Sequence, residues 1–292
     1  MALPFREVWC VDFEFGGREG DLPSPVCMVA ADALTGRSFR LWEDDLRRLD
    51  RAPFDVGPDT VMVGFYASAE VSCFRALGWP VPVNVVDLYA EFRQMTNGVA
   101  LPCGRGLIGA LAFFGLRSID VVEKEAMREL ALRGGPWTDE ERTALLEYCA
   151  SDVDALVRLL PRMEPIFDLP RALFRGRFMV AAAEIERTGI PVDTVALELL
   201  RSNWDQIKQA LVLRLDKDLG LFEGLTFRQE RFAAWLDKEG VPWPRLPSGR
   251  LALDDDSFKE MARQFPAVRP IKELRHILSK MRLEDLAVGS DG

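Results

Sequence analysis

The chain has 292 residues, 48% hydrophobic and 28% charged, which is the composition of an ordinary globular protein with a sizeable core. This length allows two domains, and no apolar run approaches the roughly 20 residues needed to cross a bilayer. The net charge of −9 argues against broad, sequence-independent nucleic-acid binding, which needs a basic surface. The five cysteines form no CxxC pair and His276 is the one histidine, so a structural zinc site is not expected. Buried free thiols in a reducing cytoplasm are the simplest interpretation.

The first predicted strand, "VWCVDFEF" at 8–15, carries two acidic residues among residues that favour strands. Side chains alternate between the faces of a strand, so Asp12 and Glu14 point to the same side. Two like charges on one face repel unless water or a cation separates them. This stretch alone fits either a solvated acidic face or half of a divalent-metal site. More carboxylates elsewhere in the chain would favour the metal site.

The next segments predict a meander followed by alternating strands and helices. Residues 25–42 read as two strands joined by a turn, and 60–66 as a strand buried on both faces. Ser68 is a candidate cap for the helix that comes next. A short strand at 83–89 ends in Asp87, which we interpret as a turn or cap residue. Helical periodicity then covers three segments, 88–97, 106–115 and 122–132.

A long helix has the clearest start signal in the chain. Thr138 followed by Glu141 matches a capping box, and Pro161 is expected to close the helix. Tyr148 and Asp152 are four residues apart and therefore share one face of this helix. They are unusual residues for a face that packs on a sheet. A core tyrosine with a satisfied hydroxyl is the alternative interpretation of Tyr148.

From about residue 171 the pattern is helical, so we predict a first domain at 1–168 and a mostly α-helical part at 169–292. A helix there is stopped by Gly189 and Pro191, and a long amphipathic helix follows. The segment 263–282 is strongly basic. It predicts either a solvated helix face or a helix that follows phosphates. Its candidate DNA-contacting residues are Arg269, Lys272, Arg275, Lys280 and Arg282.

The unusual acidic residues become informative when they are taken together. Three strands followed by helix–strand alternation predict an α/β domain, one mixed sheet flanked by helices, which brings Asp12, Glu14, Glu70 and Asp152 side by side. Four converging carboxylates need a metal, and two Mg²⁺ or Mn²⁺ ions would suit these oxygen ligands. Such a pair supports in-line phosphodiester hydrolysis, in which Tyr148 could orient the attacking water. Glu70 alone could also be a helix N-terminal acid favoured by the macrodipole.

This arrangement resembles the DEDD superfamily of 3′–5′ exonucleases, in the branch with a tyrosine in the third motif. Asp12-Phe13-Glu14 matches the first motif, and Tyr148 with Asp152 matches the third. The second motif usually reads Asn-x-x-x-Asp, and this chain has Tyr66 and Glu70 in those places. The resemblance implies an RNase H-like fold and a two-metal 3′–5′ exonuclease whose ligands are the four carboxylates.

The second half is similar to family A DNA polymerases. "FMVAAAEIERTGIPVD" resembles the segment that joins the exonuclease and polymerase domains, and the residues after 224 resemble the thumb. The palm and fingers motifs of that family do not follow. The resemblance implies a proofreading part that cannot polymerise alone, in a bacterial or phage-infected cell, with the remainder of the polymerase missing. Its expected partner is DNA, as a single-stranded 3′ end and possibly a primer-template duplex, and no membrane.

Two alternatives stay open at this stage. One is a catalytically silent exonuclease-like domain that only positions DNA, which the altered second motif supports. The other is an RNA-trimming exonuclease of the RNase D type, against which the polymerase-like second half argues.

Overall fold

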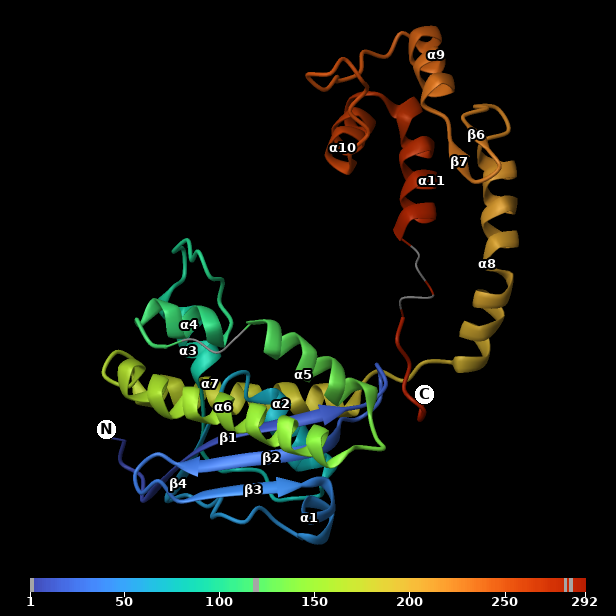
Figure 1. Ribbon diagram of the computed structural model, residues 1–292. Helices are drawn as coiled ribbons and strands as arrows, with labels where there is room; N and C mark the ends of the chain where they lie inside the picture. Colours follow the sequence, from blue (N-terminus) through green and yellow to red (C-terminus); the bar gives the residue numbers. More distant parts are fainter. Residues whose placement is uncertain (1–2, 118–120, 281–282, 284–285) are drawn as a thin grey trace. The chain divides into compact units, whose positions relative to one another are not determined.

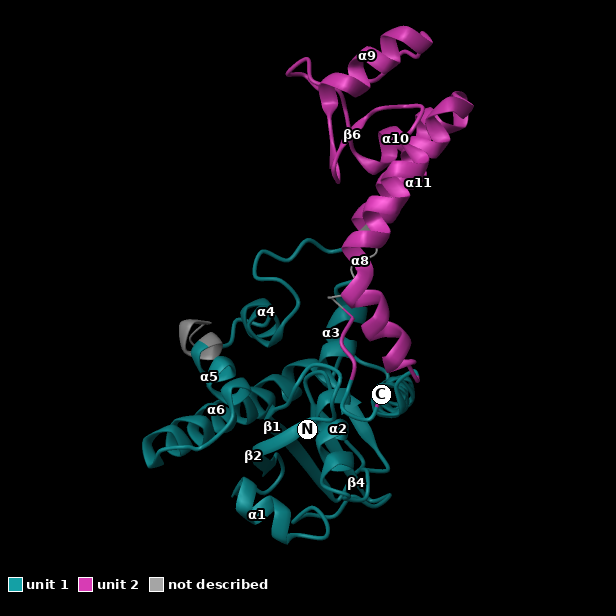
Figure 2. Ribbon diagram, turned by 90° about the vertical axis from the view of Figure 1, so that its right-hand side faces the viewer, with its two compact units in different colours: residues 1–190, 289–291 teal, residues 191–288, 292 magenta. Residues whose placement is uncertain are grey.

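The computed structural model describes residues 3–117, 121–280, 283 and 286–292, without the side chains of 121–125 and of Lys280. The chain divides into two compact units, coloured separately in Figure 2. Unit 1 comprises Met1–Ile190 and Gly289–Asp291, and unit 2 comprises Pro191–Val288 with Gly292. Within the described part of the chain, no helix is both long enough and apolar enough to cross a bilayer.

Unit 1 is built on a five-stranded sheet with the order β3-β2-β1-β4-β5. β1, β2 and β3 form an antiparallel meander, and β4 and β5 run parallel to β1. The mixed sheet and the N-terminal meander are therefore confirmed. The whole of β4 is buried, as its continuous apolar run predicts. The strands are β1 Glu7–Gly16, β2 Ser24–Asp32, β3 Ser38–Trp42, β4 Thr60–Gly64 and β5 Val85–Asp87.

Helices cover both faces of this sheet, and each face has its own core (Figure 1). The alternation of β1 separates the two cores, because Val8 and Cys10 pack on one side and Trp9 and Val11 on the other. The first core includes residues of α3 to α6, and the second includes residues of α1, α2 and α7. The helices are α1 Glu43–Arg48, α2 Ser68–Ala76, α3 Leu88–Met95, α4 Leu107–Phe113, α5 Val121–Arg133, α6 Asp139–Met163 and α7 Leu169–Thr188.

Two predicted helix boundaries are wrong by one or two residues. Ser68 does not cap α2: the cap position is Ala67, and Ser68 is the first helical residue. The carboxylate of Asp87 accepts the backbone N–H groups of Tyr66 and Ala67, which starts the helix one residue earlier. α6 begins with the predicted capping box but continues through Pro161 to Met163. A proline so near the end removes one backbone hydrogen bond, and the next turn still forms.

α7 lies in unit 1, whose main segment ends at Ile190, whereas the sequence placed its division at residue 168. The helix packs directly on β5: a Cβ at Gly176 would lie only 1.8 Å from the carbonyl oxygen of Val85. Arg175 of α7 also makes a two-pronged ion pair, at 2.5 and 2.7 Å, with the fully buried Glu91 of α3. Gly189 ends the helix at positive φ, as predicted.

Unit 2 is mostly helical, as predicted. Its aromatic core includes Phe232, Trp235 and Phe258. Its elements are α8 Thr194–Leu215, β6 Phe222–Glu223, β7 Thr226–Phe227, α9 Gln229–Glu239, α10 Asp255–Gln264, a 3₁₀ turn at Pro266–Val268 and α11 Arg269–Lys280.

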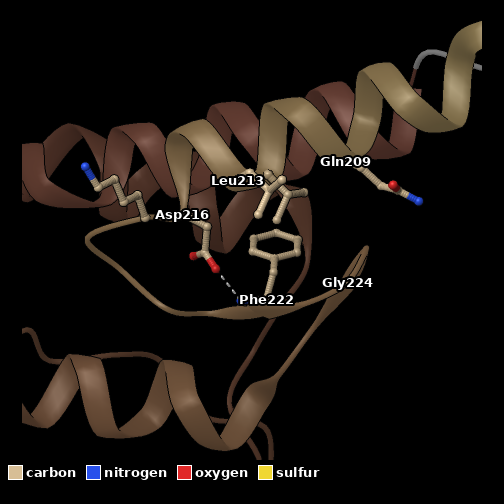
Figure 3. Close-up of a pocket in the computed structure, with 7 residues that line it drawn as sticks. Gln209, Leu213, Asp216, Phe222 and Gly224 are labelled. Atoms are coloured by element: carbon tan, nitrogen blue, oxygen red, sulfur yellow. Dashed lines mark hydrogen bonds between the residues drawn. The ribbon is translucent and has the colours of Figure 1, made fainter.

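The turn after α8 is organised by the buried Asp216, which accepts the N–H groups of Leu221 and Phe222 at 2.7 and 2.8 Å. A hollow of about 320 Å³ lies beside this turn (Figure 3). Leu213 and Phe222 line it. The role of Asp216 is therefore accounted for by the turn that it closes.

Candidate active site

β1 carries Asp12 and Glu14 on the face that α6 covers. They continue the row of Val8 and Cys10, and both are half-buried. β4 pairs with β1 only as far as Cys10, so both carboxylates lie beyond the end of β4. The pairing of β1 with β2 is irregular directly after Glu14, a feature often found beside active sites.

α6 brings Tyr148 and Asp152 to the same place. Both side chains are buried, and the Tyr148 hydroxyl donates to the Asp152 carboxylate at 3.2 Å. The i, i+4 spacing noted in the sequence makes this bond within one helical face. One residue after the tyrosine, the Cys149 thiol donates to the backbone carbonyl of Asp12 at 3.3 Å. This contact ties α6 to β1 at the level of the first carboxylate.

Three carboxylates meet in a group suited to a metal ion. One oxygen from each of Asp12, Glu14 and Asp152 lies within 4.8 Å of the others. Three charges so close together repel strongly, and a divalent cation among them removes that cost. The donors are all carboxylate oxygens, the ligand type preferred by Mg²⁺ and Mn²⁺. Burial keeps the pKa of the neighbouring Cys149 thiol well above its usual value, and the thiol is not part of this group.

Glu70 adjoins this group without belonging to it. It lies in the first turn of α2, is 4% exposed, and accepts the backbone N–H of Phe13 with one oxygen. Its Oε2 atom has no hydrogen-bond partner among the described residues. Burial raises the pKa of Glu70 well above its ordinary value, and the charges of Asp12 and Glu14 raise it further. Of the four predicted ligands, the structure therefore gathers three and places the fourth as an interacting neighbour.

Gly64, the last residue of β4, leaves space for the side chain of Glu70. A Cβ added there would lie 3.3 Å from Cγ of Glu70, closer than most Cβ contacts. A larger residue at position 64 would therefore press on this side chain.

Tyr148 keeps its proton. Burial raises the pKa of its phenol, and the charge of Asp152 raises it further. The hydroxyl is therefore a hydrogen-bond donor toward the carboxylate cluster across the physiological pH range.

A cavity of about 270 Å³ opens beside the carboxylates. Its lining combines acidic, aromatic and aliphatic groups. Sequence reasoning did not identify Tyr89, which lies two residues after the end of the parallel strand β5. Residues at the carboxyl ends of parallel strands commonly form ligand-binding sites, and this rule could have identified Tyr89 from the sequence. The lining residues are Asp12, Asp152, Phe65, Tyr66, Tyr89, Gly106, Leu107 and Leu156.

Asp87 is a cap residue, as the sequence predicted. It accepts the N–H groups of Tyr89 and Ala90 at the start of α3, at 2.8 and 3.3 Å. Burial raises the pKa of this carboxyl. It faces backbone donors and is absent from the metal-type group found among the described residues.

The basic residues of α11 are engaged in unit 2 to different degrees. The Arg275 guanidinium lies over the rings of Phe227 and Phe258, 4.5 and 4.4 Å from their centroids, and donates to the Leu253 carbonyl. Burial lowers its pKa. Arg269 is exposed and donates to the Ala262 carbonyl at 3.2 Å.

The other three predicted basic residues are Lys272, Lys280 and Arg282. Lys272 is half-buried and lines a hollow of about 530 Å³ that also contains Asp255 and Asp256. The side chain of Lys280 and the whole of Arg282 lie outside the described residues. A role of this helix in DNA binding stays a prediction.

No protein-family model and no curated protein matches this sequence. Among solved structures, the chain is similar to the POL domain of Pol1 from M. smegmatis in complex with DNA primer-template and dNTP. That likeness has a TM-score of 0.57 at 17% identity and covers 99% of this chain and 48% of the other. The chain therefore spans about half the length of that structure.

Two further structures share less of the geometry. The catalytic core of RRP6 from Trypanosoma brucei has a TM-score of 0.48 at 13% identity, over 96% of this chain and 75% of the other. Trypanosoma brucei RNase D in complex with RNA U12 has a TM-score of 0.43 at 18% identity, over 87% of this chain and 79% of the other. At such identities a likeness concerns the fold alone. The fold is that of an RNase H-like mixed sheet flanked by helices and followed by a helical part, which confirms the predicted class.

Proposed function

We propose that this chain is a divalent-metal-dependent 3′–5′ exonuclease that trims a single-stranded DNA 3′ end, as the proofreading part of a DNA polymerase. The observation that carries the proposal is the group of Asp12, Glu14 and Asp152, whose oxygens lie within 4.8 Å at one end of the sheet. A buried tyrosine bonded to the third of them adds a polar group with a defined direction. The fold shared with the Pol1 structure supports a DNA partner.

The carboxylates would hold one or two cations, with Glu70 completing the set when it loses its proton. A divalent metal in such a site lowers the pKa of a bound water and stabilises the leaving oxygen of a phosphodiester. Tyr148, held by Asp152, presents a neutral hydroxyl that can orient the water beside the scissile phosphate. Water is partly excluded because Asp152 and Tyr148 are only 6% and 5% exposed.

For unit 2 we propose the counterpart of the start and thumb of a family A polymerase domain. The alignment of 99% of this chain with the Pol1 structure supports this assignment at the level of the fold. Among Arg269, Lys272 and Arg275, the predicted basic residues whose side chains are described, Arg269 is the exposed one. Polymerisation is not expected of these residues, because the palm and fingers motifs are not among them.

A silent, DNA-positioning domain is the second candidate, and one observation favours it. Glu70 lies outside the 4.8 Å group, so the described site has three gathered ligands instead of four. If Glu70 stays protonated beside the other carboxylates, the second cation is held weakly.

The test is trimming of a 5′-labelled single-stranded oligonucleotide, as DNA and as RNA, in Mg²⁺ and in Mn²⁺. Wild type should give a ladder that shortens from the 3′ end, and Asp12→Ala and Asp152→Ala should give none. Asp154→Ala is the matched control, since Asp154 lies on the same helix, is 65% exposed and pairs with Arg158. A folded wild-type protein without a ladder in either metal establishes the silent domain. A ladder from RNA alone establishes the RNase D-type alternative.

A further inference from the structure

Tyr66 has a backbone conformation that few residues of its size adopt. Its φ is +78°, and among the described residues every other residue with positive φ is a glycine. A bulky side chain is disfavoured in this region, so the surrounding structure must enforce it. Glycine or asparagine would fit the turn between β4 and α2 at lower cost.

The enforcing group is the buried carboxylate of Asp87. Its Oδ1 accepts the N–H of Tyr66 at 3.0 Å and the N–H of Tyr89 at 2.8 Å, and its Oδ2 accepts the N–H of Ala67 at 3.2 Å. Asp87 is 1% exposed, so solvent does not compete for these bonds. A single oxygen thus sets the positions of the two tyrosines relative to each other.

The two tyrosine rings form a braced pair with one accessible member. They meet edge to face, with centroids 5.4 Å apart and planes at 73°. The ring centroids of Phe65 and Tyr89 are 5.6 Å apart. The guanidinium of Arg93 lies over the Tyr89 ring and donates to the Tyr89 hydroxyl at 3.2 Å. Tyr66 stays 48% exposed. A half-exposed ring in a strained turn is not accounted for by core packing.

The cavity that these rings line also contains Asp12 and Asp152. A ligand there meets metal-binding carboxylates at one end and aromatic faces at the other. A nucleotide has the matching chemistry, because its phosphate is anionic and its base stacks on aromatic rings whatever its sequence. The volume of about 270 Å³ lies just below the range of about 300–1,000 Å³ for small-molecule pockets, which fits a ligand as small as one nucleoside unit.

We infer that Tyr66, positioned by Asp87 and braced by Tyr89, stacks the base of one of the two nucleotides that flank the scissile phosphate. The inference rests on the proposed function and adds a subsite to it. A base held in this cavity has left its duplex, so the subsite selects an unpaired 3′ end and tolerates any sequence.

The variants that test it are Tyr66→Gly and Tyr66→Phe. The glycine variant removes the ring and suits the positive φ, so it should fold, and the phenylalanine variant keeps the ring. Phe178→Ala is the control, because Phe178 on α7 is 66% exposed and lies outside the cavity. Binding of a 5′-labelled oligonucleotide is followed by fluorescence anisotropy in Ca²⁺, and trimming in Mg²⁺ gives KM and kcat.

Stacking predicts that Tyr66→Gly raises Kd and KM about 5- to 100-fold, with a smaller change in kcat. Tyr66→Phe should stay within about 2-fold of wild type, and so should Phe178→Ala. Oligonucleotides with an abasic terminal or penultimate nucleotide complete the experiment. At one of these positions, loss of the base should weaken wild-type binding and leave the Tyr66→Gly value unchanged.

An unchanged Kd for Tyr66→Gly overturns the inference. The inference is also overturned if both abasic oligonucleotides lose the same binding affinity with wild type as with Tyr66→Gly, because the ring and the base then act independently. Ring-dependent binding without any trimming supports the subsite and contradicts the proposed hydrolysis. Trimming without ring dependence does the reverse.

Discussion

Asp152→Asn should stabilise the metal-free protein, because it removes one of three crowded charges. The oxygens of Asp152, Asp12 and Glu14 lie no more than 4.8 Å apart. At an effective dielectric constant of about 20, two unit charges at that distance repel by about 3.5 kcal/mol, and in bulk water by about 0.9 kcal/mol. Solvent screens part of this repulsion. We expect a net gain of about 1–3 kcal/mol in the free energy of unfolding.

That gain corresponds to a rise of about 2–12 °C in Tm for a domain of this size. The measurement is thermal unfolding by circular dichroism in EDTA, and again in Mg²⁺ or Mn²⁺. Metal should raise the wild-type Tm, since a ligand at 100 times its Kd stabilises by about 2.7 kcal/mol. The variant should lose most of this increment.

Asp154→Asn is the control for Asp152→Asn, because it removes one negative charge from the same helix two residues away. Its exposed ion pair with Arg158 is worth about 0.3–0.5 kcal/mol, so its Tm should change little and its response to metal should persist. The reasoning is refuted if Asp152→Asn lowers the Tm in EDTA, or if metal stabilises wild type and this variant equally.

Three further predictions concern the turn between β4 and α2 and its neighbours. Burial and nearby charges raise the pKa of Glu70, so the folded protein keeps a proton that the unfolded chain releases above about pH 4.5. The free energy of unfolding of the metal-free protein should therefore fall as the pH rises from about 4.5 through the raised pKa. Tm against pH in EDTA checks this, and an unchanged slope in Glu70→Gln contradicts it. Gly64→Ala should slow single-turnover trimming about 10- to 100-fold by displacing the side chain of Glu70, and a wild-type rate for this variant would exclude the crowding. Asp87→Ala leaves four backbone N–H groups without their acceptor and should lower the free energy of unfolding in urea by about 2–4 kcal/mol, whereas a loss under 1 kcal/mol would show that water replaces the carboxylate.

The parts of the site that local periodicity determines could be predicted from the sequence. Period two places Asp12 and Glu14 on one face of a strand, and helical spacing places Tyr148 beside Asp152. These relations depend only on the backbone geometry of one element. The meeting of the two pairs follows from the mixed sheet, whose order the alternation of elements suggests.

Contacts between distant segments were beyond the sequence. Nothing local to Gly176 shows that it lies against Val85, so the sequence did not reveal that its helix packs within unit 1. Arginine is a residue type that often binds phosphates, yet the guanidinium of Arg275 packs against two rings from other elements. Long-range packing decides such cases, and charge patterning carries no information about it.

The altered second motif bears on the choice between an active and a silent domain. Two residues depart from the resembled pattern, and each has a specific accommodation nearby. Gly64 leaves space for the side chain of Glu70, and Asp87 holds the strained backbone of Tyr66. Both arrangements have a cost: a buried carboxylate among like charges, and a bulky residue at positive φ. In a domain that only positions DNA, replacing Glu70 or Tyr66 by a less strained residue would increase stability at no functional cost. The presence of both residues beside the carboxylate group therefore favours a working site over a remnant.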